Sequence, residues 1–260
     1  HAIDYGFLQW NNDTDTLSTG ADDAPCGIID MGGSDDRDFA PPKFLAAKNV
    51  YMPDEREIHA LDDYIERFLF GKLQEPKSYL VKNCLYDNRQ TYALLKGTKK
   101  FNTIKGYLIA DEEGNETTWR RWDHTCRIYN YPHAYTIYYC MYLIAKRHHA
   151  QVSRTASEYL TMAYRTALVS YQDETYDSIY EMKNYLDYHC GNMSKTHAPM
   201  GSPVLARILE SLRDEGMLEE RRALDRAIRE CLPFFVQEEY PFATEYCYGH
   251  ASHAAVYFLA

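Results

Sequence analysis

The most regular feature of the chain is a set of segments in which apolar residues recur at the spacing of one helix face. The first follows Asp54, which suits an N-cap, and Glu57, which completes a capping box with it. Gly71 suits the end of this helix. The apolar positions between them are Ile58, Leu61, Ile65, Phe68 and Leu69. The pattern therefore predicts a helix between Asp54 and Gly71.

Similar periodicity predicts five more helices in the second half of the chain. Pro132 suits the first turn of one of them, and Ser202-Pro203 and Gly216 bound another. The apolar positions run over 134–145, 160–171, 205–212 and 224–235, and a last helix begins near Ala251. Apolar faces of this kind need partners, and short connectors between them favour antiparallel helical hairpins.

Two segments lack this periodicity. Residues 1–52 are irregular and rich in Asp and Gly, but interrupting apolar residues favour an ordered long loop over a disordered linker. Residues 72–118 form an excursion in which "DEEGN" (111–115) is a turn signal between two β-compatible runs. We expect a small β-hairpin within this excursion.

These elements predict a mainly α fold, a single domain over residues 1–260 with the 72–118 excursion inside it. Its unequal, chemically rich loops fit an (α/α) toroid of antiparallel hairpins better than a tetratricopeptide solenoid, whose characteristic residues are missing. In a toroid of this type the long loops build a cleft at one rim. The chain starts with His1 and its last residues read as a continuing helix. We therefore expect an incomplete toroid, a piece of a longer polypeptide.

The composition excludes some partners and suggests another. A net charge of −10 argues against a nucleic-acid partner, which needs clustered Lys and Arg. No apolar run is long enough to cross a membrane, so no membrane partner is expected. Tyrosine is abundant, at 24 of 260 residues. Such rings either pack half-buried with the hydroxyl reaching water or line a cleft that binds carbohydrate.

Most of the candidate chemistry lies in residues 117–135, "TTWRRWDHTCRIYNYPHAY". This stretch is predicted as a loop that enters a helix, and loops on rigid scaffolds commonly carry function. Its tryptophans can stack on sugar faces, its arginines can hold a carboxylate, and its aspartate can act as an acid or a base. The alternative is a buried polar network in which the aspartate and an arginine anchor the loop. The candidate residues are Trp119, Trp122, Asp123, Arg127, Tyr129, Tyr131 and His133.

A second aromatic loop enters a predicted helix at residues 238–250, "EEYPFATEYCYGH". Glu245 lies among its aromatic rings, where burial would raise the pKa of the carboxyl group and suit a general acid. The alternative is that Glu245 complements the dipole at a helix N-terminus.

A third candidate is the acidic, glycine-containing loop with Asp22 and Asp23. Adjacent carboxylates of this kind either bind a ligand or calcium, or are solvated turn residues. The twelve-residue spacing of an EF-hand is absent.

The remaining chemistry-bearing residues predict neither a metal nor a cofactor. The histidines form no HExxH pattern, and the seven cysteines lack zinc-ligand spacing, so buried free thiols are expected. No phosphate-binding glycine motif and no nucleophile elbow occurs. Sequons at Asn12, Asn115 and Asn192 favour a secreted protein weakly.

Four blocks of the chain, residues 40–74, 119–148, 159–168 and 241–260, resemble successive blocks of an uncharacterised family. That family comprises large microbial, mostly extracellular proteins, is similar to the six-hairpin glycosidases and is described as a domain of unknown function. The resemblance implies an (α/α)6 toroid, often preceded by a β-sandwich, with a carbohydrate-related activity. It also implies that Asp22, Asp23, Asp123, His133 and Glu245 lie in the cleft. The last block departs from the family's Pro-Phe-Gly-Ser-Glu pattern, since it reads "PFATE".

The sequence thus favours a secreted glycoside hydrolase, with Asp123 and Glu245 as the catalytic pair and a poly- or oligosaccharide as the substrate. The alternatives are a polysaccharide lyase on the same scaffold and a non-catalytic glycan-binding module. The expected partners are the carbohydrate and the rest of the parent polypeptide, namely the remaining toroid and a β-sandwich.

Overall fold

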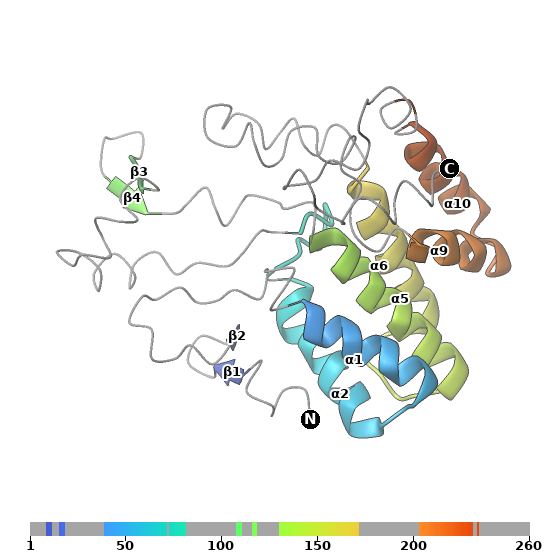
Figure 1. Cartoon of the computed structure of the whole chain (residues 1–260), viewed down its shortest axis with the longest axis horizontal. Coiled ribbons are helices and arrows are strands. Elements are labelled where there is room, and N and C mark those ends of the chain that lie inside the picture. The colour runs from blue at the N-terminus through green and yellow to red at the C-terminus, as the bar shows by residue number, and fades with distance from the viewer. Residues whose placement is uncertain are drawn as a thin grey trace, which may run out of the picture.

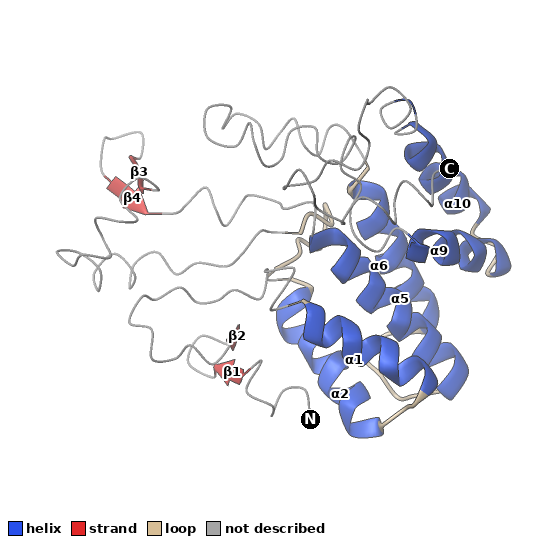
Figure 2. Ribbon diagram, viewed as in Figure 1, coloured by secondary structure: helices blue, strands red, loops and turns tan. Residues whose placement is uncertain are grey.

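The computed structural model describes residues 9–11, 16–18, 39–71, 73–81, 108–110, 116–118, 130–171, 203–230 and 233. These residues are mainly helical and form three helical hairpins (Figures 1 and 2). The hairpins are α1 (Ala40–Tyr51) with α2 (Glu55–Tyr64), α5 (Asn130–His148) with α6 (Ala156–Val169), and α9 (Pro203–Asp214) with α10 (Leu218–Glu230). A π-helical turn, η1 (Ile65–Leu69), extends α2.

The three hairpins lie side by side, with α5–α6 in the middle (Figure 1). Helices α1 and α5 run in the same direction, because His133 stacks on Phe39 at one end and His148 contacts the Val50 carbonyl at the other. Helix α9 follows them, because the Tyr139 hydroxyl meets Ser211 and the Tyr142 hydroxyl, one turn later, meets Glu215. The second helix of each hairpin returns in the opposite direction.

This arrangement gives the helical layer two different ends. At the connector end, the helices of each hairpin are joined by residues 52–54, 149–155 and 215–217. The other end, which we call the rim, consists of the first turns of α1, α5 and α9 and the last turns of η1, α6 and α10. Each longer segment between or beyond the hairpins is therefore attached at the rim.

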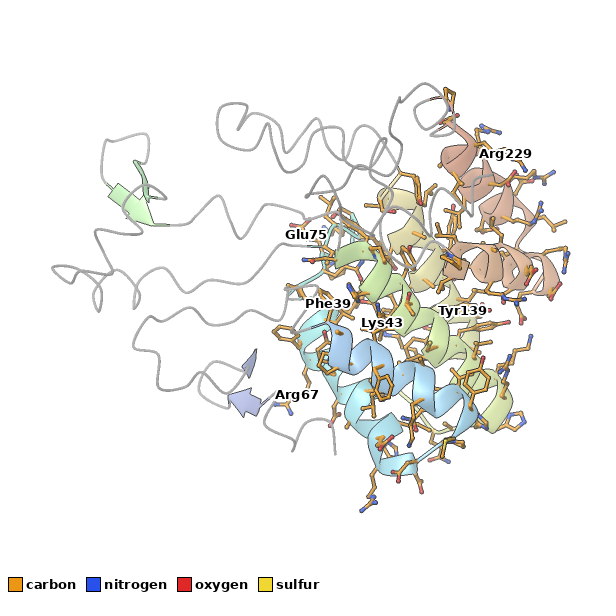
Figure 3. All side chains as sticks on the ribbon, in the orientation of Figure 1. Phe39, Lys43, Arg67, Glu75, Tyr139 and Arg229 are labelled. Carbon is orange, nitrogen blue, oxygen red and sulfur yellow. The ribbon has the colours of Figure 1, made fainter. Side chains whose placement is uncertain are left out.

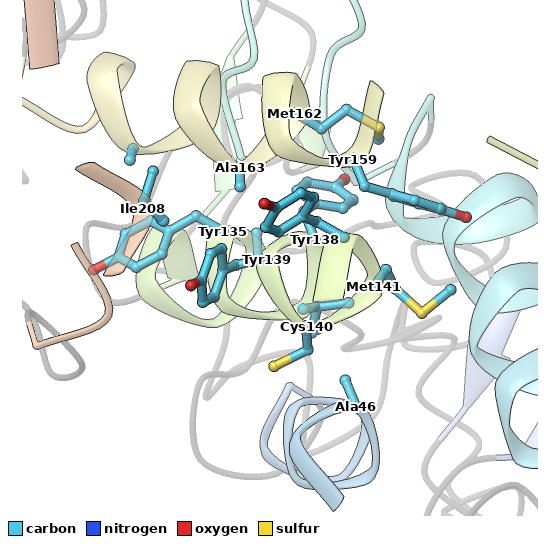
Figure 4. Close-up of a cluster of buried hydrophobic side chains, with 14 of the residues drawn as sticks. Ala46, Tyr135, Tyr138, Tyr139, Cys140, Met141, Tyr159, Met162, Ala163 and Ile208 are labelled. Atoms are coloured by element: carbon cyan, nitrogen blue, oxygen red, sulfur yellow. The ribbon is translucent and has the colours of Figure 1, made fainter. Parts of the chain in front are cut away.

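Helix α5 is the centre of the core. Its residues from Asn130 to Tyr142 are all buried, including Cys140, which faces Ala46 of α1 in Figure 4. Aromatic, β-branched and thioether side chains surround the helix, so it is apolar on every side rather than along one stripe. Such a helix is stable only when neighbours cover both of its faces, which is the position of the middle hairpin.

The structure corrects the prediction for residues 1–52, because Ala40–Tyr51 form helix α1. Pro41 and Pro42 are compatible with a helix here because they occupy its first turn. The periodicity is weak, since Phe44 and Tyr51 are 73% and 80% exposed while the buried face carries small residues such as Ala46. A pattern search for apolar faces therefore misses this helix.

The helix predicted after Asp54 is present, with two differences. The Asp54 side chain accepts hydrogen bonds from the backbone N–H groups of Arg56 and Glu57, as an N-cap does. However, the Glu57 carboxylate completes no capping box, because it accepts from Lys48 (2.7 Å) and Asn49 (2.8 Å) of α1. The helix also widens into the π-helical η1 before Gly71, which has a φ of 107°.

The predicted starts of α5 and α9 and the predicted end of α9 agree with the structure. Helices α6 and α10 occur where apolar periodicity predicted helices, but α6 ends at Val169, before the last predicted apolar position, Tyr171. Pro132 lies in the first turn of α5, Pro203 begins α9, and Gly216 adopts a φ of 76° after its end. The helix expected near Ala251 lies outside the described residues.

Short strands occur outside the helical layer. Strand β3 (Leu108–Ala110) pairs antiparallel with β4 (Glu116–Thr118), on either side of the predicted turn. Strands β1 (Gln9–Asn11) and β2 (Thr16–Ser18) form a second antiparallel pair. Among the described helices, none has both the length and the hydropathy of a membrane span.

Candidate functional site

The rim is the part of the fold to which the predicted site residues are connected. Tyr131 and His133 lie within the described first turn of α5. The other candidates lie outside the described residues, in segments that join the helical layer at the rim. They are Asp22, Asp23, Trp119, Trp122, Asp123, Arg127, Tyr129 and Glu245.

The first turn of α5 places polar rings inside the protein rather than on its surface. Pro132 favours the helix start by fixing its own φ, and the turn then buries Asn130, Tyr131 and His133. The imidazole of His133 is 3% exposed and stacks on Phe39, with ring centroids 5.8 Å apart and an interplanar angle of 19°. His133 therefore helps to join α1 to α5 at the rim.

A buried hydrogen-bond network lies beside this turn. The Tyr138 hydroxyl donates to the Gln74 side chain (2.7 Å), whose amide donates to the Thr166 hydroxyl (2.8 Å) and to the Tyr79 carbonyl (2.9 Å). Burial holds the pKa of Tyr138 well above its ordinary value, so this hydroxyl stays protonated and acts as a donor. The network fixes residues 73–81 against α5 and α6.

Residues 70–71 and 73–81 lie in a tight turn that follows η1 and adjoins the rim. Tyr79 has a φ of 63°, which is unusual for an aromatic residue and implies local strain. Its ring lies 5.8 Å from the Phe70 ring centroid, and the Arg165 guanidinium lies 5.4 Å from the Tyr79 centroid. The hydrogen bond from the Gln74 amide to the Tyr79 carbonyl helps to hold Tyr79 in this conformation. No sequence pattern identified this turn, because the conformation depends on contacts with α6.

Tyr135 differs from three of the other buried tyrosines of α5, namely Tyr138, Tyr139 and Tyr142. The hydroxyls of Tyr138, Tyr139 and Tyr142 each meet a partner, whereas that of Tyr135 has none within the part of the chain that the structure describes. The Tyr135 side chain is fully buried, and this burial, with Tyr171 as a further cause, raises the pKa of its hydroxyl well above the ordinary value. Tyr135, in the second turn of α5, therefore carries a protonated hydroxyl that makes no hydrogen bond to the described residues.

The described residues offer no obvious metal site or thiol nucleophile. No group of three or more His, Cys, Asp or Glu side chains in the described ranges is arranged to hold an ion. Cys140 is a buried free cysteine, and burial raises the pKa of its thiol to about 12. A thiol with that pKa is protonated at neutral pH and is a poor nucleophile. The described rim therefore offers hydroxyl, amide and ring groups rather than a reactive centre of its own.

Helix ends give the rim a distinct electrostatic character. The first turns of α1, α5 and α9, all at the rim, contain no acidic residue. By contrast, the first turns of α2, α6 and α10 at the connector end all contain glutamate, such as Glu55, Glu158 and Glu219. A helix N-terminus carries a partial positive charge, so three of these charges are left without a nearby carboxylate in the same turn.

Comparison with known proteins gives one family match. The model of a family described as "Family of unknown function (DUF5695)" matches residues 27–260. No curated protein and no solved structure matches the chain.

Proposed function

We propose, from the premise that this chain belongs to the DUF5695 family of unknown function, that it is a secreted, carbohydrate-active protein. The most specific form of this proposal is a glycoside hydrolase with the six-hairpin type of fold. The three parallel hairpins then constitute part of an (α/α) toroid, and the rim is the mouth of its cleft.

One observation supports the proposal most directly: the longer segments all join the same end of the helical layer. These segments contain the aromatic and acidic candidate residues, including Trp122, Asp123 and Glu245. A rigid helical scaffold that presents its variable loops at one end is a common basis for a binding or catalytic site.

In the proposed mechanism, two carboxyl groups flank the scissile glycosidic bond. Glu245, among aromatic residues of its loop, protonates the leaving oxygen, while Asp123 stays ionised and assists water or attacks the sugar. Trp119 and Trp122 hold a sugar ring by stacking, and Arg127, Tyr129, Asp22 and Asp23 contact its substituents. Tyr131 and His133, which are buried, position the first turn of α5. No cofactor is required for this chemistry.

The test is digestion of a panel of poly- and oligosaccharides with the full chain, followed by analysis of product ends. New reducing ends that lack ultraviolet absorbance identify hydrolysis. The substitutions Asp123→Asn and Glu245→Gln are each expected to lower turnover at least about a hundredfold, the scale of acid–base assistance. Asp63→Asn and Glu219→Gln, at exposed positions of α2 and of the connector end of α10, are charge-matched controls that should leave turnover unchanged. Near-normal turnover in both active-site variants contradicts the assignment.

A polysaccharide lyase is the second candidate, and one observation favours it. The helix N-termini at the rim lack acidic residues, which suits a substrate that carries a carboxylate. A lyase leaves an unsaturated product end that absorbs in the ultraviolet, so the same digest distinguishes it from a hydrolase. Binding without any cleavage identifies a glycan-binding module instead.

A further inference from the structure

We propose that the rim binds the carboxylate of a uronic-acid-containing glycan, with the Tyr135 hydroxyl as a hydrogen-bond donor to the ligand. This inference rests on the proposed carbohydrate function and deepens it by naming a substrate class. It stands on two independent observations: the charge pattern of the helix ends and the unsatisfied hydroxyl of Tyr135.

The first observation is the asymmetry between the two ends of the layer. At the connector end, the charges of the side chains complement both kinds of helix terminus. Glutamates occupy the first turns of α2, α6 and α10, and basic residues occupy the last turns of α1, α5 and α9, for example Lys48, Lys146 and Arg213. Each of these placements is favourable to the helix dipole.

At the rim, charged side chains accompany helix C-termini but not helix N-termini. The helix C-termini there are accompanied by Arg67 in the last turn of η1 and Arg229 in the last turn of α10. The N-termini of α1, α5 and α9 have no acidic partner in their first turns. Of the described acidic residues near this end, Glu66 pairs with Arg154, with nitrogen and oxygen 2.7 Å apart, and Glu230 is the exposed last residue of α10, next to Arg229 (Figure 3). The helix N-termini at the rim, which have no acidic residue in their first turns, therefore favour a negatively charged group, although the whole chain has a net charge of −10.

The N-termini of α1 and α5 lie close to each other, and α9 begins near the first two turns of α5. Phe39, the N-cap of α1, stacks on His133 in the first turn of α5. Tyr135 of α5 lies beside Ile208 of α9 in Figure 4, less than two turns from the start of α9 at Pro203. Proline occurs in the first turn of each helix, and proline has no N–H to donate. A ligand anion at this end therefore needs a side-chain donor in addition to the helix dipoles.

The second observation supplies that donor. Side chains on a helix lean towards its N-terminus, and Figure 4 shows the Tyr135 ring extending away from Tyr138, towards Ile208 of α9. Its hydroxyl is fully buried and has no hydrogen-bond partner among the described residues. Buried hydroxyls without an acceptor are uncommon in native proteins, and a ligand carboxylate is an acceptor of the right kind.

The binding test compares an acidic oligosaccharide with its neutral counterpart on the full chain. The probes are oligomers of galacturonate, glucuronate and mannuronate, each paired with its fully methyl-esterified form, and affinity is measured by titration calorimetry. We expect at least one acidic oligomer to bind about tenfold more tightly than its ester. This preference should weaken between roughly 0.01 M and 0.15 M salt, as the screening length falls from about 30 to 8 Å.

Two charge-matched variants test the role of the helix ends. Pro203 and Ser157 are both exposed and both lie in the first turn of a helix, α9 at the rim and α6 at the connector end. Pro203→Glu should weaken binding of the acidic oligomer about two- to fivefold, the scale of a charge at a helix terminus. Ser157→Glu adds the same charge at the other end and should leave the affinity unchanged. Tyr135→Phe should weaken binding about tenfold without lowering the melting temperature.

The outcomes separate this inference from the proposed function. If a neutral glycan binds or is cleaved and the esters bind as well as the acids, the uronate inference is wrong while the carbohydrate function stands. Equal effects of Pro203→Glu and Ser157→Glu, or unchanged affinity in Tyr135→Phe, also overturn the inference. If neither acidic nor neutral glycans bind, both proposals fail.

Discussion

The two ends of the helical layer are built differently, and the difference separates stability from candidate function. At the connector end, side chains satisfy the helix termini: Asp54 caps α2, and Thr155 and Glu158 form a complete capping box on α6. At the rim, the α1 N-cap is Phe39, which makes no side-chain capping bond. Short connectors leave little room for variation, so their termini are satisfied locally. The first turn of α1 therefore lacks the stabilisation that a side-chain cap would add.

The same contrast holds for buried hydroxyls. Asp62 of α2 accepts from the backbone N–H (2.8 Å) and hydroxyl (2.7 Å) of Ser153 and from the hydroxyl of Tyr159. It thereby attaches the 149–155 connector to α2. Tyr135 at the rim has no comparable acceptor among the described residues. The following predictions test whether the connector end stabilises the fold and the rim does not.

The largest effect is expected for Asp62→Ala. This change leaves the buried Tyr159 hydroxyl and the Ser153 N–H without their acceptor, and should lower the free energy of unfolding by about 3 kcal/mol. The matched control is Asp63→Ala, at the exposed neighbouring position, which should change it by less than about 0.5 kcal/mol. Urea unfolding of the full chain measures both values. Similar losses in the two variants would contradict a specific role for Asp62.

A smaller difference in the free energy of unfolding is expected between phenylalanine variants of two tyrosines in the same helix. Tyr138→Phe removes the donor to the buried Gln74 side chain and should lower the free energy of unfolding by about 1–3 kcal/mol. Tyr135→Phe removes a hydroxyl without a described partner and should be neutral within about 0.5 kcal/mol or slightly stabilising. Urea unfolding in the absence of glycan measures the pair. A large loss in Tyr135→Phe would show that its hydroxyl has a structural partner within the protein.

The capping box at the connector end should contribute about 1 kcal/mol to the free energy of unfolding. Thr155→Ala removes the side-chain acceptor for the Glu158 N–H and the hydroxyl that donates to the Glu158 carboxylate. Thr155→Ser keeps both bonds and is the control. Thermal unfolding should show a lower melting temperature for the alanine variant alone. Equal melting temperatures for the two variants would mean that the box adds nothing to the stability of α6.

The smallest effect concerns acid stability. The Lys146 ammonium, followed by the Tyr142 hydroxyl, donates to Glu215, and these bonds lower the pKa of its carboxyl below the ordinary value of 4.5. Because the pKa is lowered in the folded state, the stabilisation is present above about pH 4.5 and is lost as the pH falls through the folded-state pKa. The Glu215→Gln variant should therefore be less stable than the parent at pH 7. The difference between their free energies of unfolding should decrease as the pH is lowered. A difference that stays constant from pH 7 to about pH 3 contradicts this assignment.

Local sequence signals determined most of the helical framework. Proline in first turns and glycine after last turns placed α5 and α9, since each acts through its own backbone geometry. Asp54 likewise marked the start of α2. The capping box of Thr155 and Glu158 was also visible as a Thr-x-x-Glu pattern, although the apolar periodicity alone had located α6. These features depend on residues within one or two turns, which is why the sequence alone sufficed.

Tertiary structure decided the features that depend on distant contacts. Helix α1 has no continuous apolar face, so its packing on α5 was needed to define it. The Glu57 carboxylate accepts hydrogen bonds from Lys48 and Asn49 of the preceding helix instead of completing a capping box, because the hairpin brings those donors close to it. The strained backbone of Tyr79 and the isolation of the Tyr135 hydroxyl arise only when α5 and α6 pack together. Whether a polar group is satisfied is a property of three-dimensional neighbours, and no local pattern records it.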